Sequence, residues 1–314
     1  MVAMLAGIVA GTAQADGLPV VGVDVGAEGT ANIGSEHRFV ALPVGKNTLV
    51  ARIERGSGKV RATRIHRGHL TIPAVAYDGS AAGVSADGLR LVLIVPRPTF
   101  PRATTTFAIL DTSELKIQSL VTLKGDFSFD AMSPDARWLY LIQYTSPDDP
   151  LQYRVRALNS LTGRLDPRPI VDPREPGEAM NGNPLTRAMS PDGRWAYTFY
   201  EGTEHPFVHA LDTVAGSARC IDLDWLHSRQ DLWAMRFSIS EDGLLSLRSG
   251  DKTVAVVDTR TFAATTGVEA DDDGRSPWVF VVGIGLLLAA AAVLYVVGSR
   301  RRAASTSFGG ATSA

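Results

Sequence analysis

A four-residue turn recurs along this chain about every fifty residues, and this repeat constrains the fold more than any other feature. Each copy has serine at its first position and aspartate at its third, and the copies begin at Ser85, Ser133, Ser190 and Ser240. Their spacings are 48, 57 and 50 residues, and a degenerate earlier copy fits at Ser35. Asp-Gly turns supply an Asx hydrogen bond and a positive φ, so we interpret the repeated aspartates as turn formers.

Each repeat also contains four short runs of strand-forming residues, one before the turn and three after it. In one repeat these runs are Phe127–Met132, Trp138–Gln143, Val155–Ser160 and Arg164–Val171. Four strands per fifty residues is the period of a β-propeller blade. The sequence therefore predicts an all-β fold, a β-propeller of about five four-stranded blades over residues 34–268. Residues 16–33 are either an N-terminal linker or a closing strand.

Two of the turns carry a family resemblance. Residues 133–138 (Ser-Pro-Asp-Ala-Arg-Trp) and 190–195 (Ser-Pro-Asp-Gly-Arg-Trp) resemble the SPDGRW repeat of WD40-like, TolB-type β-propellers. The strand Val254–Thr259 resembles the YVTN-type variant of that repeat. The resemblance covers residues 34–268, and the other copies depart from the pattern. It implies a binding or interaction platform, often in a secreted or periplasmic protein.

Residues 1–15 resemble the end of a secretory signal peptide. The segment has no charge, and Ala13-Gln14-Ala15 matches an A-x-A cleavage site. The basic residues that open such a peptide are missing, so we expect the true start codon to lie upstream.

Residues 278–297 form an uncharged run of 20 residues, long enough to cross a bilayer as a helix. Arg300, Arg301 and Arg302 follow it, and the linker 269–277 before it is acidic. The positive-inside rule then places residues 298–314 in the cytoplasm and the propeller outside. The sequence predicts a single-pass protein of the cell membrane with one C-terminal transmembrane helix.

Composition and motifs exclude several classes of function. The chain has 31 basic and 33 acidic residues, which argues against a nucleic-acid partner. Cys220 is its single cysteine, so a disulfide framework and a cysteine-based zinc site are excluded. We interpret Cys220 as a buried small apolar residue, with a reactive or intermolecularly paired thiol as the alternative. No motif for a nucleophile, a phosphate loop or a zinc protease occurs, so we predict no catalytic residue and no cofactor.

The histidine spacings also argue against a metal site. His66 and His69 are separated by an arginine, which disfavours a cation between them. His205 and His209 are expected in one strand, where residues four apart lie about 13 Å from each other. We therefore predict no metal.

A first candidate binding site lies on the inner strands that face the central channel. Asp130 and Arg187 occupy equivalent positions on adjacent blades, three residues before the turn serine, and Arg236 is one residue away from that position. These side chains form either a structural ion pair or a site for a small ligand or ion.

A second candidate is the aromatic and charged loop at residues 224–233. It contains Trp225, His227, Arg229 and Trp233. The loop could contact a partner, or it could cap the ring with both tryptophans packed inward.

These features predict a membrane-anchored, non-catalytic binding platform at the bacterial cell surface. Its partner would be a protein, peptide or glycan, and no nucleic acid is expected. One alternative is a glycosidase-like hydrolase that uses Asp78 and Asp130 in the central channel. Another is a surface sensor that relays a signal through a cytoplasmic partner.

Overall fold

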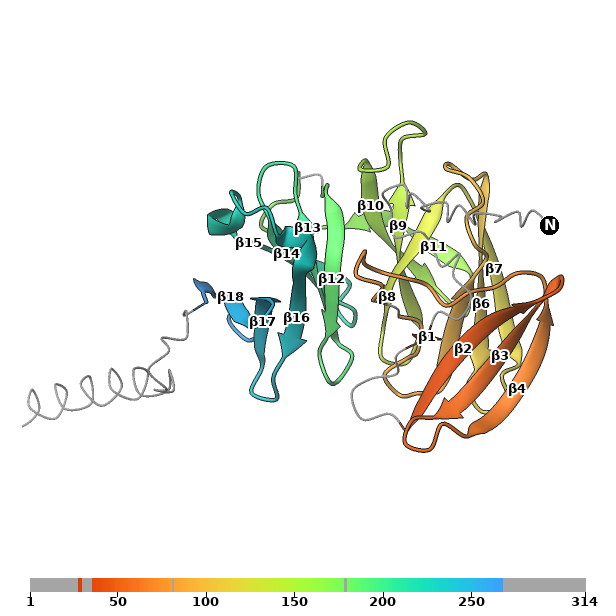
Figure 1. Cartoon of the computed structure of the whole chain (residues 1–314). Helices are drawn as coiled ribbons and strands as arrows, with labels where there is room; N and C mark the ends of the chain where they lie inside the picture. The colour runs from red at the N-terminus through yellow and green to blue at the C-terminus, as the bar shows by residue number, and fades with distance from the viewer. Residues whose placement is uncertain (1–27, 30–35, 81, 178–179, 268–314) are drawn as a thin grey trace, which may run out of the picture. The chain divides into compact units, whose positions relative to one another are not determined.

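A computed structural model describes residues 28–29, 36–80, 82–177 and 180–267. In this part of the chain, nineteen strands form five antiparallel sheets that follow one another in chain order (Figure 1). The expected signal peptide, acidic linker, transmembrane helix and cytoplasmic tail lie outside the described residues, as does most of 16–33. Among the described residues, no helix combines the length and apolarity needed to span a bilayer.

The sheets are simple meanders of neighbouring strands. The first contains β1 (Glu28–Gly29), β2 (His37–Val44), β3 (Asn47–Glu54) and β4 (Val60–Arg67). The second contains β5 (Arg90–Ile94), β6 (Thr104–Asp111) and β7 (Ile117–Lys124). The third contains β8 (Phe127–Met132), β9 (Trp138–Tyr144), β10 (Tyr153–Asn159) and β11 (Arg164–Ile170). The fourth contains β12 (Asn183–Met189), β13 (Trp195–Glu201), β14 (Phe207–Asp212) and β15 (Ser217–Asp222). The fifth contains β16 (Met235–Ile239), β17 (Leu244–Ser249), β18 (Lys252–Asp258) and β19 (Ala264–Thr266), and the 3-10 helices η1 (Asp224–Leu226) and η2 (Leu232–Ala234) precede it.

In the third, fourth and fifth sheets the repeated turns join the innermost strand to the next strand, and in the second sheet the turn at Ser85 precedes β5. Their aspartates form the turns as predicted. In the turn at Ser190, the hydroxyl donates to the Asp192 carboxylate at 2.5 Å and accepts the backbone N–H of Trp195 at 2.8 Å. The same two bonds recur at Ser85 and Ser133, and at Ser240 the accepted N–H is that of Leu244, one residue earlier in the turn. The fourth residue has a positive φ in every copy, which favours glycine.

Four hydrophobic clusters lie between consecutive sheets. They contain Phe39 with Leu91, Phe107 with Phe129, Tyr140 with Leu211, and Phe199 with Leu245. Each fully buried side chain of this size stabilises the fold by about 1.5–3 kcal/mol. Among the described residues, none of these clusters joins the fifth sheet to the first.

The second sheet corrects the expectation of four strands in every blade. The predicted inner strand Ile72–Tyr77 is absent, and only isolated bridges from Thr71 to Ile94 and from Val84 to Leu91 border β5. Pro73 lacks the N–H that a ladder needs, and Gly83 has a φ of 133°, which no strand residue adopts. The chain therefore leaves the sheet between the two bridges.

The segment between these bridges, described at residues 72–80 and 82–83, reaches the fourth sheet through Tyr77 and Asp78. The backbone N–H groups of Tyr77 and Asp78 donate to the carbonyl oxygens of Pro184 and Leu185 at 2.9 and 3.1 Å. The ring of Tyr77 lies 5.0 Å from that of Trp233. We call residues 72–83 the crossing segment, because it joins the second sheet to strands that are not its neighbours in the repeat.

Candidate binding site

A cavity of about 540 Å³ lies between the third and fourth sheets. Its walls come from β10, β11, β14 and β15, and its roof from residues 171–177 and 180–181 of the polar insertion after β11. Tyr153 and Phe207 contribute aromatic surface to the walls, and Met180 contributes apolar surface to the roof. This volume falls within the range of small-molecule pockets, about 300–1,000 Å³.

The roof is fastened to the fourth sheet by specific hydrogen bonds. The Ala218 N–H donates to the Val171 carbonyl at 3.3 Å, and the Thr203 hydroxyl donates to the Asn181 side-chain oxygen at 2.8 Å. From the third sheet, the Tyr153 hydroxyl donates to the carbonyl of Gly182 at 2.9 Å. The insertion is therefore a defined wall of the pocket.

A row of polar residues crosses the fourth sheet beneath this pocket. Strand register pairs Arg187 on β12 with Thr198 on β13, Thr198 with His209 on β14, and His209 with Cys220 on β15. Residues directly opposite in antiparallel strands project from the same face of a sheet. The row therefore connects the innermost strand to the pocket, where His209 and Cys220 both line the wall.

His209 is the most unusual member of this row. It is only 3% exposed, and no hydrogen bond joins its ring nitrogens to any described residue. Its nearest ring is Tyr200, at 6.3 Å and edge to face. Burial lowers the pKa of His209 to about 4, although the charge of Asp130 opposes this shift. At neutral pH the pocket thus contains a neutral imidazole with unused hydrogen-bonding capacity.

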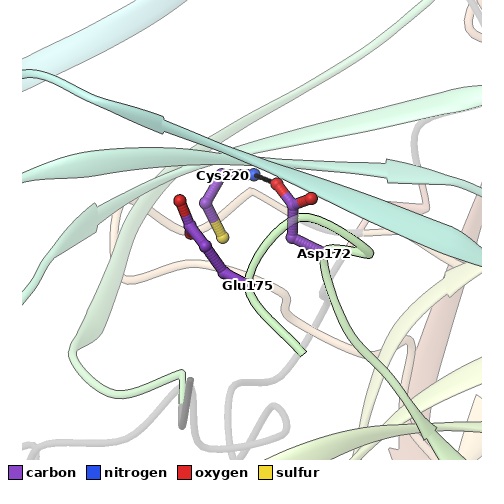
Figure 2. Close-up of side chains that lie close together, drawn as sticks. All are labelled: Asp172, Glu175 and Cys220. Atoms are coloured by element: carbon purple, nitrogen blue, oxygen red, sulfur yellow. Dashed lines mark hydrogen bonds between the residues drawn. The ribbon is translucent and has the colours of Figure 1, made fainter. Parts of the chain in front are cut away.

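Asp172, Glu175 and Cys220 lie together at the pocket wall, with their possible ligand atoms all within 4.8 Å of one another (Figure 2). Asp172 is the structural member of this group. Its carboxylate accepts hydrogen bonds from Arg174, the closest at 2.6 Å, and from the backbone N–H of Cys220 at 2.9 Å. Burial raises the pKa of Asp172, but these hydrogen bonds outweigh it and lower the pKa to about 2. Asp172 therefore fixes the roof to β15 and holds Glu175 close to the Cys220 side chain.

The charge around the cavity is predominantly negative. Among the residues that line it, the carboxylates are Asp172, Glu175, Glu204 and Asp222, and the only arginine is Arg154. Arg174 neutralises Asp172, and His205 lies 2.9 Å from Asp222. Glu175 and Glu204 are exposed. The pocket thus favours ligands that carry positive charge.

At the first site that the sequence indicated, Asp130 and Arg187 do come together. They form an ion pair between β8 and β12 in which each side chain is 4% exposed, and Arg187 also donates to the Asp130 carbonyl at 2.8 Å. Arg236 is not part of this pair: its guanidinium lies 3.8 Å from Asp78 instead. The expected three-residue group is therefore divided, because the crossing segment places Asp78 next to Arg236.

At the second site, the alternative in which both tryptophans pack inward is wrong. Trp225 is 39% exposed and Trp233 is 47% exposed, whereas Leu226 and Leu232 are buried. The short helices η1 and η2 turn these leucines inward. His227, Arg229 and Trp233 border a shallow hollow of about 220 Å³. These side chains are accessible to a partner, which the prediction of a partner-binding loop requires.

The sequence analysis did not predict this pocket. His205 was expected to share a strand with His209, but β14 begins at Phe207 and His205 lies in the loop before it. The relevant neighbour of His209 is Cys220, eleven residues later across a hairpin. Pairing β14 with β15 through the turn at residues 213–216 would have brought these two residues together.

Comparisons with known proteins give structural likeness only. No protein-family model matches the chain, and no curated protein matches its sequence. TolB from Acinetobacter baumannii is 11% identical over 74% of this chain and 52% of its own, with a TM-score of 0.42. A functionally unknown protein from Desulfotomaculum acetoxidans is 12% identical over 77% of this chain and 68% of its own, with a TM-score of 0.47. The Cps50 (Swd1) β-propeller domain of Myceliophteria thermophila is 9% identical over 83% of this chain and 72% of its own, with a TM-score of 0.43. This chain thus spans about half the length of that TolB, and these likenesses carry no conclusion about function.

Proposed function

We propose that this protein is a non-catalytic binding protein, and that its ligand site is the pocket between the third and fourth sheets. The observation that carries the proposal is a cavity of about 540 Å³ into which the buried His209 projects without a hydrogen-bond partner among the described residues. A ligand in the cavity can bond to the His209 ring nitrogens, which no described residue occupies.

The charge of the pocket supports a ligand with a positively charged group, such as a basic side chain of a protein or peptide. Glu175 and Glu204 are exposed carboxylates at the cavity, and among the described residues that line it Arg154 is the single arginine. Arg174 shows how a guanidinium binds at this pocket, because it forms an ion pair with Asp172. A second cation can interact with the remaining carboxylates in the same manner.

A non-catalytic role is supported by the state of the two channel carboxylates. Asp130 is ion-paired with Arg187, and Asp78 lies 3.8 Å from Arg236. A glycosidase uses two carboxyl groups that both face the substrate, whereas each of these carboxylates lies against an arginine. This arrangement disfavours the hydrolase alternative.

The pocket proposal is tested by saturation-transfer NMR with arginine amide and spermidine as cationic probes and glutarate as the anionic control. The buffer contains a chelator. We expect transfer to both cations and none to glutarate. Thr203→Trp places an indole at the exposed pocket border and should weaken the transfer, whereas Leu161→Trp, at a residue 79% exposed on a distant turn, should not. Equal transfer in both variants, or none in the unaltered chain, would overturn the proposal.

We further propose that the protein is displayed outside a cell membrane and anchored by residues 278–297. The uncharged run and the three arginines after it support this topology. Fractionation provides the test: deletion of residues 278–314 should release the protein from the membrane fraction. Protease added to intact cells should digest the propeller and spare a tag at the C-terminus. A propeller that resists protease on intact cells but not on lysed cells would contradict this topology.

A further inference from the structure

We propose that the wall of this pocket is a binding site for a single transition-metal ion of the zinc type, with Cys220, Glu175 and His209 as ligands. The inference rests on the proposed binding function and identifies one cation that the pocket accepts. It departs from the sequence-based expectation of no metal, which considered only histidines close together in the chain.

The first argument is the proximity of unlike donors. A sulfur from Cys220 and a carboxylate from Glu175 lie within 4.8 Å of each other, on β15 and on the roof (Figure 2). Zinc binds thiolate at about 2.3 Å and carboxylate at about 2.0–2.2 Å, so adjacent ligand atoms around it lie somewhat closer than 4.8 Å. A small movement of the exposed Glu175 side chain is sufficient to reach that separation.

The second argument is independent of the acidic group. His209 is 3% exposed, lines the same cavity, and has no hydrogen-bond partner among the described residues. It is the register partner of Cys220, so the two Cβ atoms are expected about 4.5–5.5 Å apart on one face of the sheet. The His209 ring nitrogens lie outside the group of ligand atoms within 4.8 Å of one another, so binding one ion requires the imidazole to rotate towards the Cys220 sulfur.

The nature of the donors selects the metal. Sulfur, imidazole nitrogen and carboxylate together favour zinc over calcium or magnesium, which prefer oxygen ligands. Cys220 and His209 belong to the wall and Glu175 to the roof, and all three line the cavity, so a fourth coordination position faces the cavity. Asp172 is not a ligand in this assignment, because Arg174 and the Cys220 backbone already occupy its oxygens. It instead holds the roof, and with it Glu175, against β15.

The chain offers a site-specific readout, because Cys220 is its only cysteine. The full-length untagged chain, purified in detergent and freed of metal with a chelator, is titrated with Co²⁺. We expect one equivalent to produce a thiolate-to-cobalt charge-transfer band in the near ultraviolet. One equivalent of Zn²⁺ should bleach this band, because zinc binds such sites more tightly than cobalt does.

Variants then assign the ligands. Cys220→Ser should abolish the charge-transfer band. His209→Gln and Glu175→Gln each remove a ligand and should weaken Co²⁺ binding by more than about 10-fold, the smallest loss typical of a residue that only supports a ligand. Glu175 lies on an exposed loop, so its variant tests the assignment even if the buried His209→Gln does not fold. Glu204→Gln removes a carboxylate from the same pocket outside the cluster and is the matched control, with no expected change.

The absence of a charge-transfer band in the unaltered chain would overturn the proposal. So would a band that keeps its affinity in Glu175→Gln and His209→Gln, because the thiolate would then bind metal without these partners. Transfer to the cationic NMR probes is measured in chelator and does not depend on metal. A chain that binds those probes but forms no cobalt band therefore retains the proposed function and loses only the metal site.

Discussion

Arg187 on β12 and Asp130 on β8 form a buried ion pair that joins the innermost strands of the fourth and third sheets. Loss of one partner leaves an uncompensated charge in the interior, so Asp130→Ala should lower the free energy of unfolding by about 3–5 kcal/mol. The double variant Asp130→Leu, Arg187→Met should recover most of that loss, because it removes both charges. Chemical denaturation of the two proteins measures the difference. If the double variant is as unstable as the single one, the pair does not act as a unit.

The buried hydroxyl of Thr198 offers a test of the polar row. It is 1% exposed and has no hydrogen-bond partner among the described residues, so Thr198→Val should raise the free energy of unfolding by about 1 kcal/mol. Thr48 is the matched control, because its equally buried hydroxyl donates to the Gly68 carbonyl and accepts from the Leu70 N–H, both at 2.8 Å. Thr48→Val should cost about 1–3 kcal/mol. Equal destabilisation by both changes would mean that the Thr198 hydroxyl is satisfied in solution.

His209 should make the stability of the metal-free chain depend on pH. Its pKa is lowered from 6.5 to about 4 in the folded protein, so between these values the unfolded chain binds the proton more readily. The contribution of the neutral His209 to the free energy of unfolding is therefore fully present above pH 6.5. It is lost as the pH decreases towards 4, and the loss is about 3 kcal/mol at most. Asp130, Arg187 and Asp172 are the charged groups around the ring. Thermal unfolding at pH 4.5 and pH 7 measures the fall, and His209→Gln should reduce it.

The fourth residue of the repeated turn, which has a positive φ, gives a prediction about how well the turn tolerates a side chain. Gly88 has a φ of 71°, and no atom lies within 4 Å of the place that a Cβ would take, so Gly88→Ala should cost only backbone strain, about 1–2 kcal/mol. Gly56 is equally open but has no positive φ, and Gly56→Ala should change stability by less than about 0.5 kcal/mol. Urea midpoints of the two variants separate strain from crowding. Equal midpoints would show that the turn tolerates a side chain.

Local sequence signals were sufficient for the repeat but not for the pocket. Ser133 and Asp135 specify their turn through contacts within five residues, so a single copy of the motif contains the information. The crossing segment could not be predicted this way. Its strand-like residues Pro73 and Val75 bond to Ala82 and Ser80 within the segment, and Tyr77 bonds to β12, so none of them extends the ladder of β5.

The candidate site depends even more on distant contacts. Asp130 and Arg187 were correctly brought together, because equivalent repeat positions face each other. His209, Cys220 and Glu175 meet only through the register of β14 with β15 and the fold of the insertion. Neither the register of these two strands nor the fold of the insertion can be recognised from residues close together in the sequence.

The crossing segment has a consequence for how the protein folds and fluctuates. In a linear array of modules each unit contacts its neighbours, so an end can fray without disturbing distant units. Here the N–H groups of Tyr77 and Asp78 bond to β12, about 100 residues further along the chain, and Trp233, just before the fifth sheet, contacts Tyr77. Closing so long a loop is slow, and its release exposes groups in three sheets together. Amide hydrogen exchange in the second and fourth sheets should therefore report one cooperative opening.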